Sequence, residues 1–230
     1  MSVLSTLIRH DATLQYRYGI YAAYAFVIVF YIVVLTLGRG LLPAWGVGLV
    51  IYTDPAAVGF FFLGALVMLE RGEGVRTALA VTSLRAVTYL AAKIATLGSI
   101  SLGACAILIL VHGEVANPAL LLLAVALSSL AFIGLAIPIA LRFRTVNGYF
   151  IGSAGFLAPI IGLGGLALLE PMPLWMALWP PVAQFRLVLV ATGYGTADAG
   201  EIAAMLAVSA VAAAAMLAWA TAALHKELGK

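Results

Sequence analysis

Residues 70–93 read ERGEGVRTALAVTSLRAVTYLAAK, a charged stretch that separates two long apolar runs. Residues 56–69 before it carry no charge at all. Within residues 70–74, three charged side chains then arrive together with two glycines, which weaken a helix. This pattern is typical of a membrane helix that leaves the bilayer.

The second half of the stretch predicts a short helix followed by the start of a long one. Apolar or small side chains recur at helical spacing at Val75, Ala78, Leu79 and Thr82, which favours a short surface helix with Arg76 to one side. Ser83 then has the residue type of a helix N-cap, so a new helix is expected to begin at Leu84 and to continue into the next apolar run.

The composition assigns the whole chain to the membrane. Of its 230 residues, 65% are hydrophobic and 9% are charged, and the mean hydropathy is +1.16. Soluble domains do not have this composition, so we expect an all-α integral membrane protein. The sequence pI is about 9.1, but the basic residues are spread between apolar runs, which argues against nucleic acid as a partner. The single cysteine, Cys105, lies within an apolar run and is interpreted as a core residue.

Six apolar segments are long enough to be transmembrane helices within a single domain that covers residues 1–230. The expected spans are residues 18–37, 55–69, 88–111, 119–141, 148–169 and 202–224. The second is short unless residues 49–52 also lie in the bilayer. Asp54 and Pro55 are interpreted as its start, because an acidic cap followed by proline favours a helix N-terminus.

The segments outside the spans have their own patterns. Residues 1–17 suit an amphipathic helix in the headgroup layer, although a frayed terminus fits them almost as well. Residues 170–200 contain four prolines and two tryptophans, so they predict short interfacial or re-entrant pieces. Asp198 and Glu201 have the spacing of a capping box at the start of the last span.

A substrate route is expected along three spans. It comprises one face of the first span, an aromatic cluster of the second and a glycine seam of the fifth: Tyr21, Tyr24 and Tyr31; Phe60, Phe61 and Phe62; Gly152 and Gly155. Buried tyrosine hydroxyls need hydrogen-bond partners, so Tyr24 and Tyr31 are expected to face other helices or a cavity. The glycines would let another backbone approach closely. Ordinary helix packing remains the alternative explanation for each feature.

Several kinds of chemistry have no motif in the sequence. There is no G-x-x-x-x-G-K-[ST] for nucleotide binding, no G-x-S-x-G and no H-E-x-x-H. The three histidines are scattered without metal-ligand spacing, so no metal site and no enzymatic activity are expected. Because the centres of the spans are expected to lack ionisable residues, ion-coupled transport is disfavoured, and energy is expected to arrive through the loop at residues 70–93.

The distribution of charge predicts the orientation. Ten of the twelve lysines and arginines fall on the side of the termini and of residues 70–93, and Arg39 and Arg186 fall on the other side. By the positive-inside rule, the termini and this loop are expected to be cytoplasmic.

The loop resembles the cytoplasmic coupling loop of type-2 ATP-binding-cassette exporter permeases, and most of all the fluoroquinolone-export branch. That loop has an acidic exit with a glycine, a short apolar helix, a "VTP" sequence and a Tyr-Leu-x-x-Lys start of the next span. The matching positions are Glu70-Arg71-Gly72, Leu79, Val81-Thr82-Ser83 and Tyr89-Leu90-Ala91-Ala92-Lys93. Serine stands here in place of the usual proline, and it can also cap a helix.

The resemblance implies an exporter of amphipathic or hydrophobic molecules in a bacterial cell membrane. It also implies an elbow helix at residues 1–17, separate ATPase subunits that bind ATP and Mg²⁺, and a second permease chain, identical or homologous. The residues that would couple to the ATPase are Glu70, Arg71, Val75, Arg76, Leu79 and Arg85. The alternatives are a solvated loop of an unrelated membrane protein, and a membrane enzyme or scaffold that uses no ATP.

The orientation can be tested by cysteine accessibility. In a Cys105-free background, a cysteine at Thr77 should react with an impermeant probe only after the cell is opened, while a cysteine at Ala116 should react in intact cells. Labelling of the Thr77 position from outside would reverse the topology.

Overall fold

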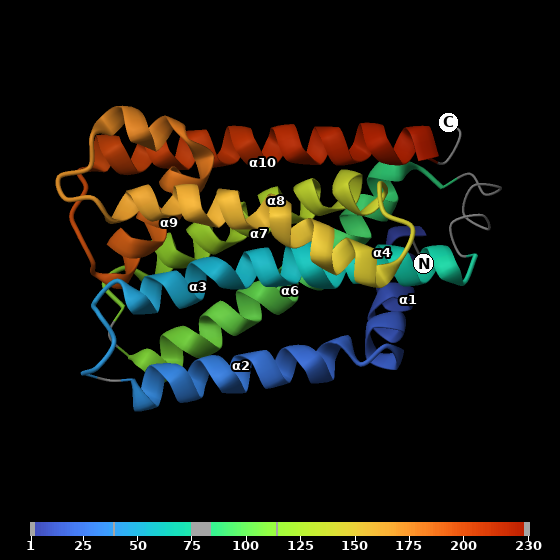
Figure 1. Cartoon of the computed structure of the whole chain (residues 1–230), viewed down its shortest axis with the longest axis horizontal. Coiled ribbons are helices and arrows are strands. Elements are labelled where there is room, and N and C mark those ends of the chain that lie inside the picture. Colours follow the sequence, from blue (N-terminus) through green and yellow to red (C-terminus); the bar gives the residue numbers. More distant parts are fainter. Residues whose placement is uncertain (1–2, 39, 75–83, 114, 228–230) are drawn as a thin grey trace.

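The computed structural model describes residues 3–38, 40–74, 84–113 and 115–227, and the part it describes is helical (Figure 1). Its α-helices are α1 (Val3–Arg17), α2 (Ile20–Leu37), α3 (Gly46–Ala56), α4 (Leu63–Gly72), α6 (Ala86–His112), α7 (Pro118–Ala140), α8 (Val146–Gly164), α9 (Pro180–Thr192) and α10 (Ala199–Glu227). Three other helical segments are η1 (Ala57–Phe62, a π-helix), η2 (Gly165–Leu168) and η3 (Leu174–Leu178). Six stretches are long and apolar enough to cross a membrane, which confirms the predicted fold class.

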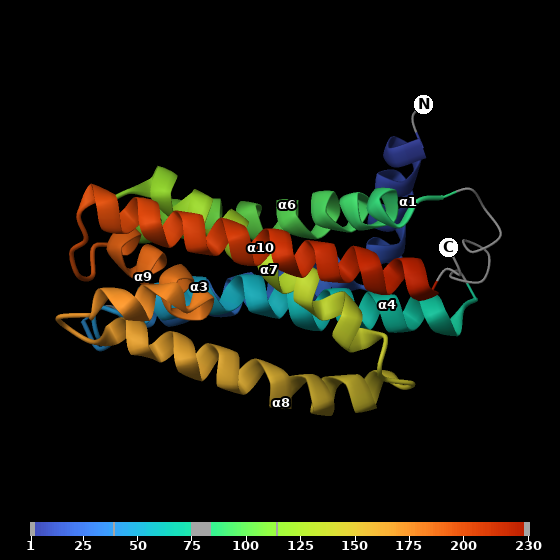
Figure 2. The same ribbon diagram turned by 90° about the horizontal axis from the view of Figure 1, so that it is seen from above.

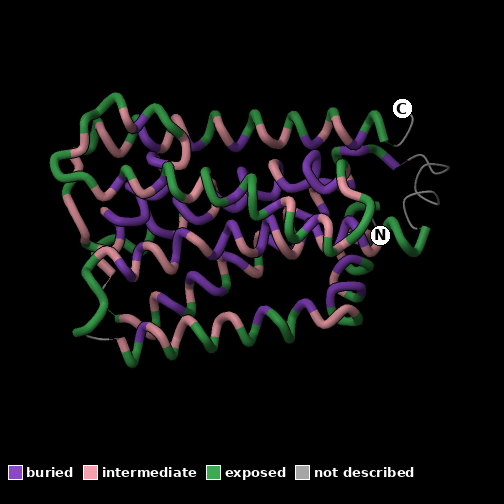
Figure 3. The backbone as a smooth tube through the Cα atoms, in the orientation of Figure 1, coloured by how far each residue is buried: buried purple, intermediate pink, exposed green. Residues whose placement is uncertain are grey.

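The long helices run side by side along the longest axis of the molecule, and α7 lies in their middle (Figure 2). The colouring by burial agrees, because purple residues gather along the inner helices and green ones along α2 and α10 (Figure 3). The end of α10, the end of α4 and the start of α6 lie at one end of the bundle, where α1 runs across the other helices. We call this the α1 end; η3 and α9 lie towards the opposite end.

The second span is longer than predicted, and the interpretation of Asp54 as its cap is wrong. The helix begins at Gly46 and continues without interruption to Gly72, a span of 27 residues. Asp54 and Pro55 therefore lie inside the helix rather than at its start. A proline interior to a membrane helix is tolerated when local π-type adjustment and neighbouring helices satisfy the freed backbone groups, and the π-helix η1 follows directly.

Close backbone packing occurs at a glycine other than the predicted ones. A Cβ atom on Gly134 of α7 would lie 2.6 Å from the backbone carbon of Met216, so this glycine allows α7 and α10 to touch. In the predicted seam of α8, Gly152 instead packs on the ring of Phe143, and the space beside Gly155 is open. Within the described chain, Gly152 and Gly155 bring no second backbone close, and an approach by another chain at this seam stays a prediction.

The third span covers all of its expected residues 88–111, but its helix begins slightly later than the predicted start at Leu84. Helix α6 starts at Ala86, and Arg85 takes the N-cap position without a side-chain hydrogen bond, so the predicted start at Leu84 is wrong. The predicted short helix at residues 75–81 and Ser83 lie outside the described residues.

Residues 170–200 are broken into short helices, as the prolines predicted. Helix α9 is buried among α3, α7, α8 and α10, whereas Trp175 and Trp179 are more than half exposed, at 61% and 53%. The capping box is confirmed as well. The Asp198 amide donates to Glu201 Oε2 at 3.0 Å, and the Glu201 amide donates to Asp198 Oδ1 at 2.8 Å.

Candidate functional site

The predicted coupling residues divide into three groups in the structure. Glu70 and Arg71 lie in the last turn of α4, and Arg85 is exposed just before α6. Val75, Arg76 and Leu79 lie outside the described residues. The described part of the loop at residues 70–93 is its base, which consists of the end of α4, the first turns of α6 and the part of α1 that crosses them.

A buried cluster of charged groups joins the three helices at this base. The Lys93 ammonium of α6 donates to Asp11 Oδ1 of α1 at 2.8 Å and to Glu70 Oε1 of α4. Tyr89, one turn before Lys93, donates its hydroxyl proton to Glu70 Oε2. Lys93 has no exposed surface, and Asp11 and Glu70 are at most 3% exposed. The two ends of the loop are thus bonded to each other and to α1.

Further contacts hold the surroundings of this cluster in place. Gln15 of α1 donates to Thr96 Oγ1 of α6 at 2.9 Å. Arg71 donates to the carbonyl oxygen of Phe143 at 3.1 Å, which fastens the end of α4 to the turn between α7 and α8. Burial raises the pKa of the Asp11 carboxyl, and the neighbouring Lys93 ammonium opposes that rise.

Sequence reasoning missed the roles of Asp11 and Lys93. In the sequence, Lys93 belongs to the Tyr-Leu-x-x-Lys pattern of the resemblance, and Asp11 lies in the amphipathic helix predicted at residues 1–17. Neither pattern predicts an ion pair between them. The available signal was the helical spacing of Tyr89 and Lys93 within an otherwise apolar segment, since a buried lysine requires an acidic partner.

A second polar centre lies inside the span that runs from Gly46 to Gly72. The Asp54 carboxylate accepts from the Tyr24 hydroxyl of α2 at 2.7 and 2.8 Å and from Ser101 of α6 at 3.1 Å. Among the described residues, no ion pair involves Asp54. The prediction that Tyr24 faces other helices is confirmed, with 3% of its surface exposed. The expectation that spans lack an interior ionisable residue is wrong, and ion coupling is not disfavoured on that ground.

An apolar groove of about 280 Å³ separates α2 from α4 and α8. It is lined by Tyr18, Gly19, Ile20, Ala23, Phe61, Phe62, Ala65, Leu69 and Phe150. Phe61 stacks on Phe150 with ring centroids 6.0 Å apart, and Phe62 meets Tyr24 edge-on at 5.9 Å. Parts of two predicted route features, the first span and the aromatic cluster, therefore meet here.

The other predicted route residues do not line this groove. Phe60 is fully buried, and its carbonyl oxygen accepts a hydrogen bond from Tyr149. Tyr21 is exposed, Tyr31 is half-buried, and Gly152 and Gly155 lie on α8 away from the groove lining. Among the described residues, no cluster of three or more His, Cys, Asp and Glu side chains could hold a metal ion.

Comparison with known proteins identifies the family. The model of the Fluoroquinolones export permease protein family matches residues 2–228. The chain belongs to this family. It is also 31% identical, over 182 residues, to the fluoroquinolones export permease proteins of two Mycobacterium tuberculosis strains, CDC 1551 / Oshkosh and ATCC 25618 / H37Rv. These matches cover 78% of this chain and 73% of each relative. No solved structure matches significantly.

Family membership and the six apolar helices together make the chain a multi-pass membrane permease of an export family. In such a protein, the groove and the charged base of the loop differ in what they can do. The groove has the aromatic lining that suits a planar apolar molecule. The base of the loop is a bonded junction that can transmit a displacement from one helix to the next.

The junction can be tested by removing its cation. Lys93→Met should leave two buried carboxylates unpaired and destabilise the purified protein by about 3–5 kcal/mol, whereas replacing all three members (Asp11→Asn, Glu70→Gln, Lys93→Met) should restore much of the loss. Lys226→Met, at an exposed position of α10, is the matched control. The measurement is thermal unfolding in detergent, and a Lys93→Met protein as stable as the control would show that the cluster is unimportant.

Proposed function

We propose that this chain is the membrane subunit of an ATP-driven exporter that moves amphipathic or hydrophobic small molecules out of a bacterial cell. Membership of the export permease family supports the transport role. The relatives are named for fluoroquinolones, so planar drugs of this class are the first candidate substrates. The sequence carries no P-loop, and we assign ATP and Mg²⁺ to separate ATPase subunits.

The observation that carries the coupling proposal is the Asp11–Lys93–Glu70 cluster. An ATPase that pushes on residues 75–81 would load the end of α4 and the start of α6. Because these helices are bonded to each other and to α1 by buried charges, a displacement would move the three helices together rather than bend the loop alone. Leu79 would provide the apolar anchor on the ATPase, and Arg76 and Arg85 would contact it at the rim.

The orientation and assembly follow from the same proposal. The α1 end of the bundle would face the cytoplasm, with α1 as the elbow helix in the headgroup layer. The opposite end, which carries η3 and α9, would face outward. The complete transporter would contain a second permease chain, identical or homologous, because two ATPases would need two docking loops.

One observation favours a second candidate function, namely transport driven by an ion gradient. Asp54 is a buried carboxylate within a span, and such groups are common on proton pathways. Its bonds to Tyr24 and Ser101 also serve to tie three helices together, so a purely structural role explains the same geometry. Export from reconstituted vesicles that requires ATP and persists without a proton gradient would support the first candidate.

The coupling proposal predicts a sharp difference between two substitutions in the loop. Leu79→Asp should release the ATPase or uncouple its hydrolysis from export, because a buried apolar anchor is commonly worth ~2 kcal/mol or more. Arg76→Ala should have little effect, since a rim charge contributes much less. Co-purification and drug-stimulated ATPase activity in reconstituted membranes are the measurements. An intact, coupled complex with Leu79→Asp would refute the assignment of this stretch.

The groove predicts which aromatic side chains affect the substrate range. Phe61→Ala should lower resistance to a planar drug at normal expression, and Tyr24→Ala should alter it, because the Tyr24 ring packs edge-on against Phe62 of the lining. Tyr31→Ala should alter resistance only if the route continues along α2 beyond the groove, which Tyr31 does not line. Phe26→Ala is the control, because Phe26 also lies on α2 but is 73% exposed and does not line the groove. Equal resistance in all of these variants would place the route elsewhere.

A further inference from the structure

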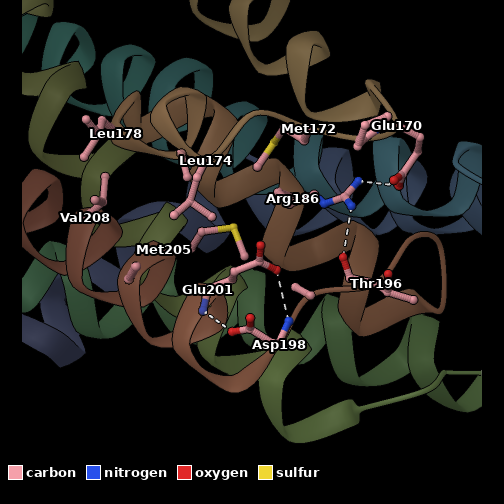
Figure 4. A pocket seen from close by; sticks show the side chains of 14 residues that line it. Glu170, Met172, Leu174, Leu178, Arg186, Thr196, Asp198, Glu201, Met205 and Val208 are labelled. Atoms are coloured by element: carbon pink, nitrogen blue, oxygen red, sulfur yellow. Dashed lines mark hydrogen bonds and ion pairs between the residues drawn. The ribbon is translucent and has the colours of Figure 1, made fainter.

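The largest cavity that we describe lies at the end of the bundle opposite α1, between η3, the segment before α10 and α10 itself (Figure 4). Its volume is about 570 Å³, which falls within the range of small-molecule sites. None of the predicted coupling or route residues that the structure describes lines it. It is therefore separate from both features of the candidate site.

Polar groups gather on one side of this cavity and apolar side chains on the other (Figure 4). The apolar side consists mainly of Met172, Leu174, Leu178, Met205 and Val208. Two of the three acidic residues, Asp198 and Glu201, come from the start of α10, and the third is Glu170. A molecule in the cavity would thus meet hydrocarbon at one end and carboxylates at the other.

The one cation in the lining, Arg186, is already engaged by the protein. Its guanidinium donates to Glu170 Oε1 at 2.7 Å and to the carbonyl oxygens of Ala167 and Thr196 at 3.2 and 3.1 Å. Only 4% of its surface is exposed. The hydrogen bond from Arg186 lowers the pKa of Glu170, so this carboxyl stays ionised and balances the guanidinium.

The remaining two carboxylates have no cationic partner among the described residues. Each uses one oxygen to accept a backbone amide in the capping box, and the second oxygens, Asp198 Oδ2 and Glu201 Oε1, take no part in these two bonds. With three carboxylates and one guanidinium, the lining has an excess of two negative charges. The amide bonds orient one oxygen of each carboxylate, and Asp198 is exposed while Glu201 is half-buried, so the negative charge lies where a molecule entering the cavity can meet it.

We propose that this cavity binds amphiphilic organic cations, with the apolar body against Met205 and Leu174 and the positive charge at Asp198 and Glu201. The inference rests on the proposed function for its biological meaning, because the cavity would then be an outward-facing site of the exporter. An acidic edge beside an apolar wall favours cations over neutral and anionic molecules of the same shape, because it attracts a positive charge and repels a negative one.

Binding can be measured on the full-length protein in nanodiscs of phosphatidylcholine, with rhodamine 6G as the cationic probe and fluorescein as an anionic dye of related shape. The double variant Asp198→Asn, Glu201→Gln removes both charges and keeps residue types that cap a helix. It should weaken rhodamine 6G binding about tenfold. Glu73→Gln, the same chemical change at the α1 end, should leave the affinity unchanged.

A steric pair of variants tests the location. Ala204 lines the cavity and Ala203 does not, and both are exposed on α10. Ala204→Trp should abolish saturable rhodamine 6G binding while Ala203→Trp retains it. Equal binding in the double variant and the unmodified protein, or in both tryptophan variants, overturns the proposal, as does equally tight binding of fluorescein. No ATPase takes part in the assay, so its outcome is independent of whether the coupling proposal holds.

Discussion

The ammonium of Lys93, buried between Asp11 and Glu70, is the interaction that determines how the α1 end of this molecule is built. An unpaired charge in a low-dielectric interior is costly, so the charges that α1, α4 and α6 bring to this point must be balanced, and the loss of one member alone leaves the others uncompensated. The pairing also fixes the distance between the two ends of the segment at residues 73–85. The residues that flank this segment on both sides therefore belong to one hydrogen-bonded cluster. The cluster also includes α1, at the start of the chain.

The same rule governs the polar centre within the bilayer. Asp54 has no cation beside it in the described chain, and the hydroxyls of Tyr24 and Ser101 replace hydration, with the single Tyr24 proton shared between the two carboxylate oxygens. Only 17% of the α2 span is buried, and its half-buried side chains Val27, Ile28, Tyr31 and Ile32 pack against the two apolar clusters. The bond between Tyr24 and Asp54 adds a polar contact that ties α2 to the second span beside the groove.

The sequence allowed the class of fold, the approximate spans and the broken segment at residues 170–200 to be predicted, because each depends on local composition. The capping box at Asp198 was predictable for the same reason: its partner is three residues away. Asp54 was misinterpreted because Asp-Pro favours a helix start in most contexts, and only the burial of residues 46–53 against other helices reveals an interior position. The partners of Lys93 are 82 and 23 residues away, and no local pattern indicates such pairs.

The helix from Gly46 to Gly72 connects the features of the candidate site. Its 27 residues correspond to about 40 Å at 1.5 Å per residue, enough to reach from the charged base to the opposite end of the bundle. At that opposite end it lies close to α9, because a Cβ atom on Gly48 would come within 2.8 Å of Leu189. Its middle is the π-helix η1, which presents Phe61 to the groove and follows Pro55. A π segment lacks the regular hydrogen-bond pattern of an α-helix, so it is where this helix can bend at least cost. A displacement of Glu70 would therefore reach the aromatic lining of the groove before it reached α9, and the groove would respond first.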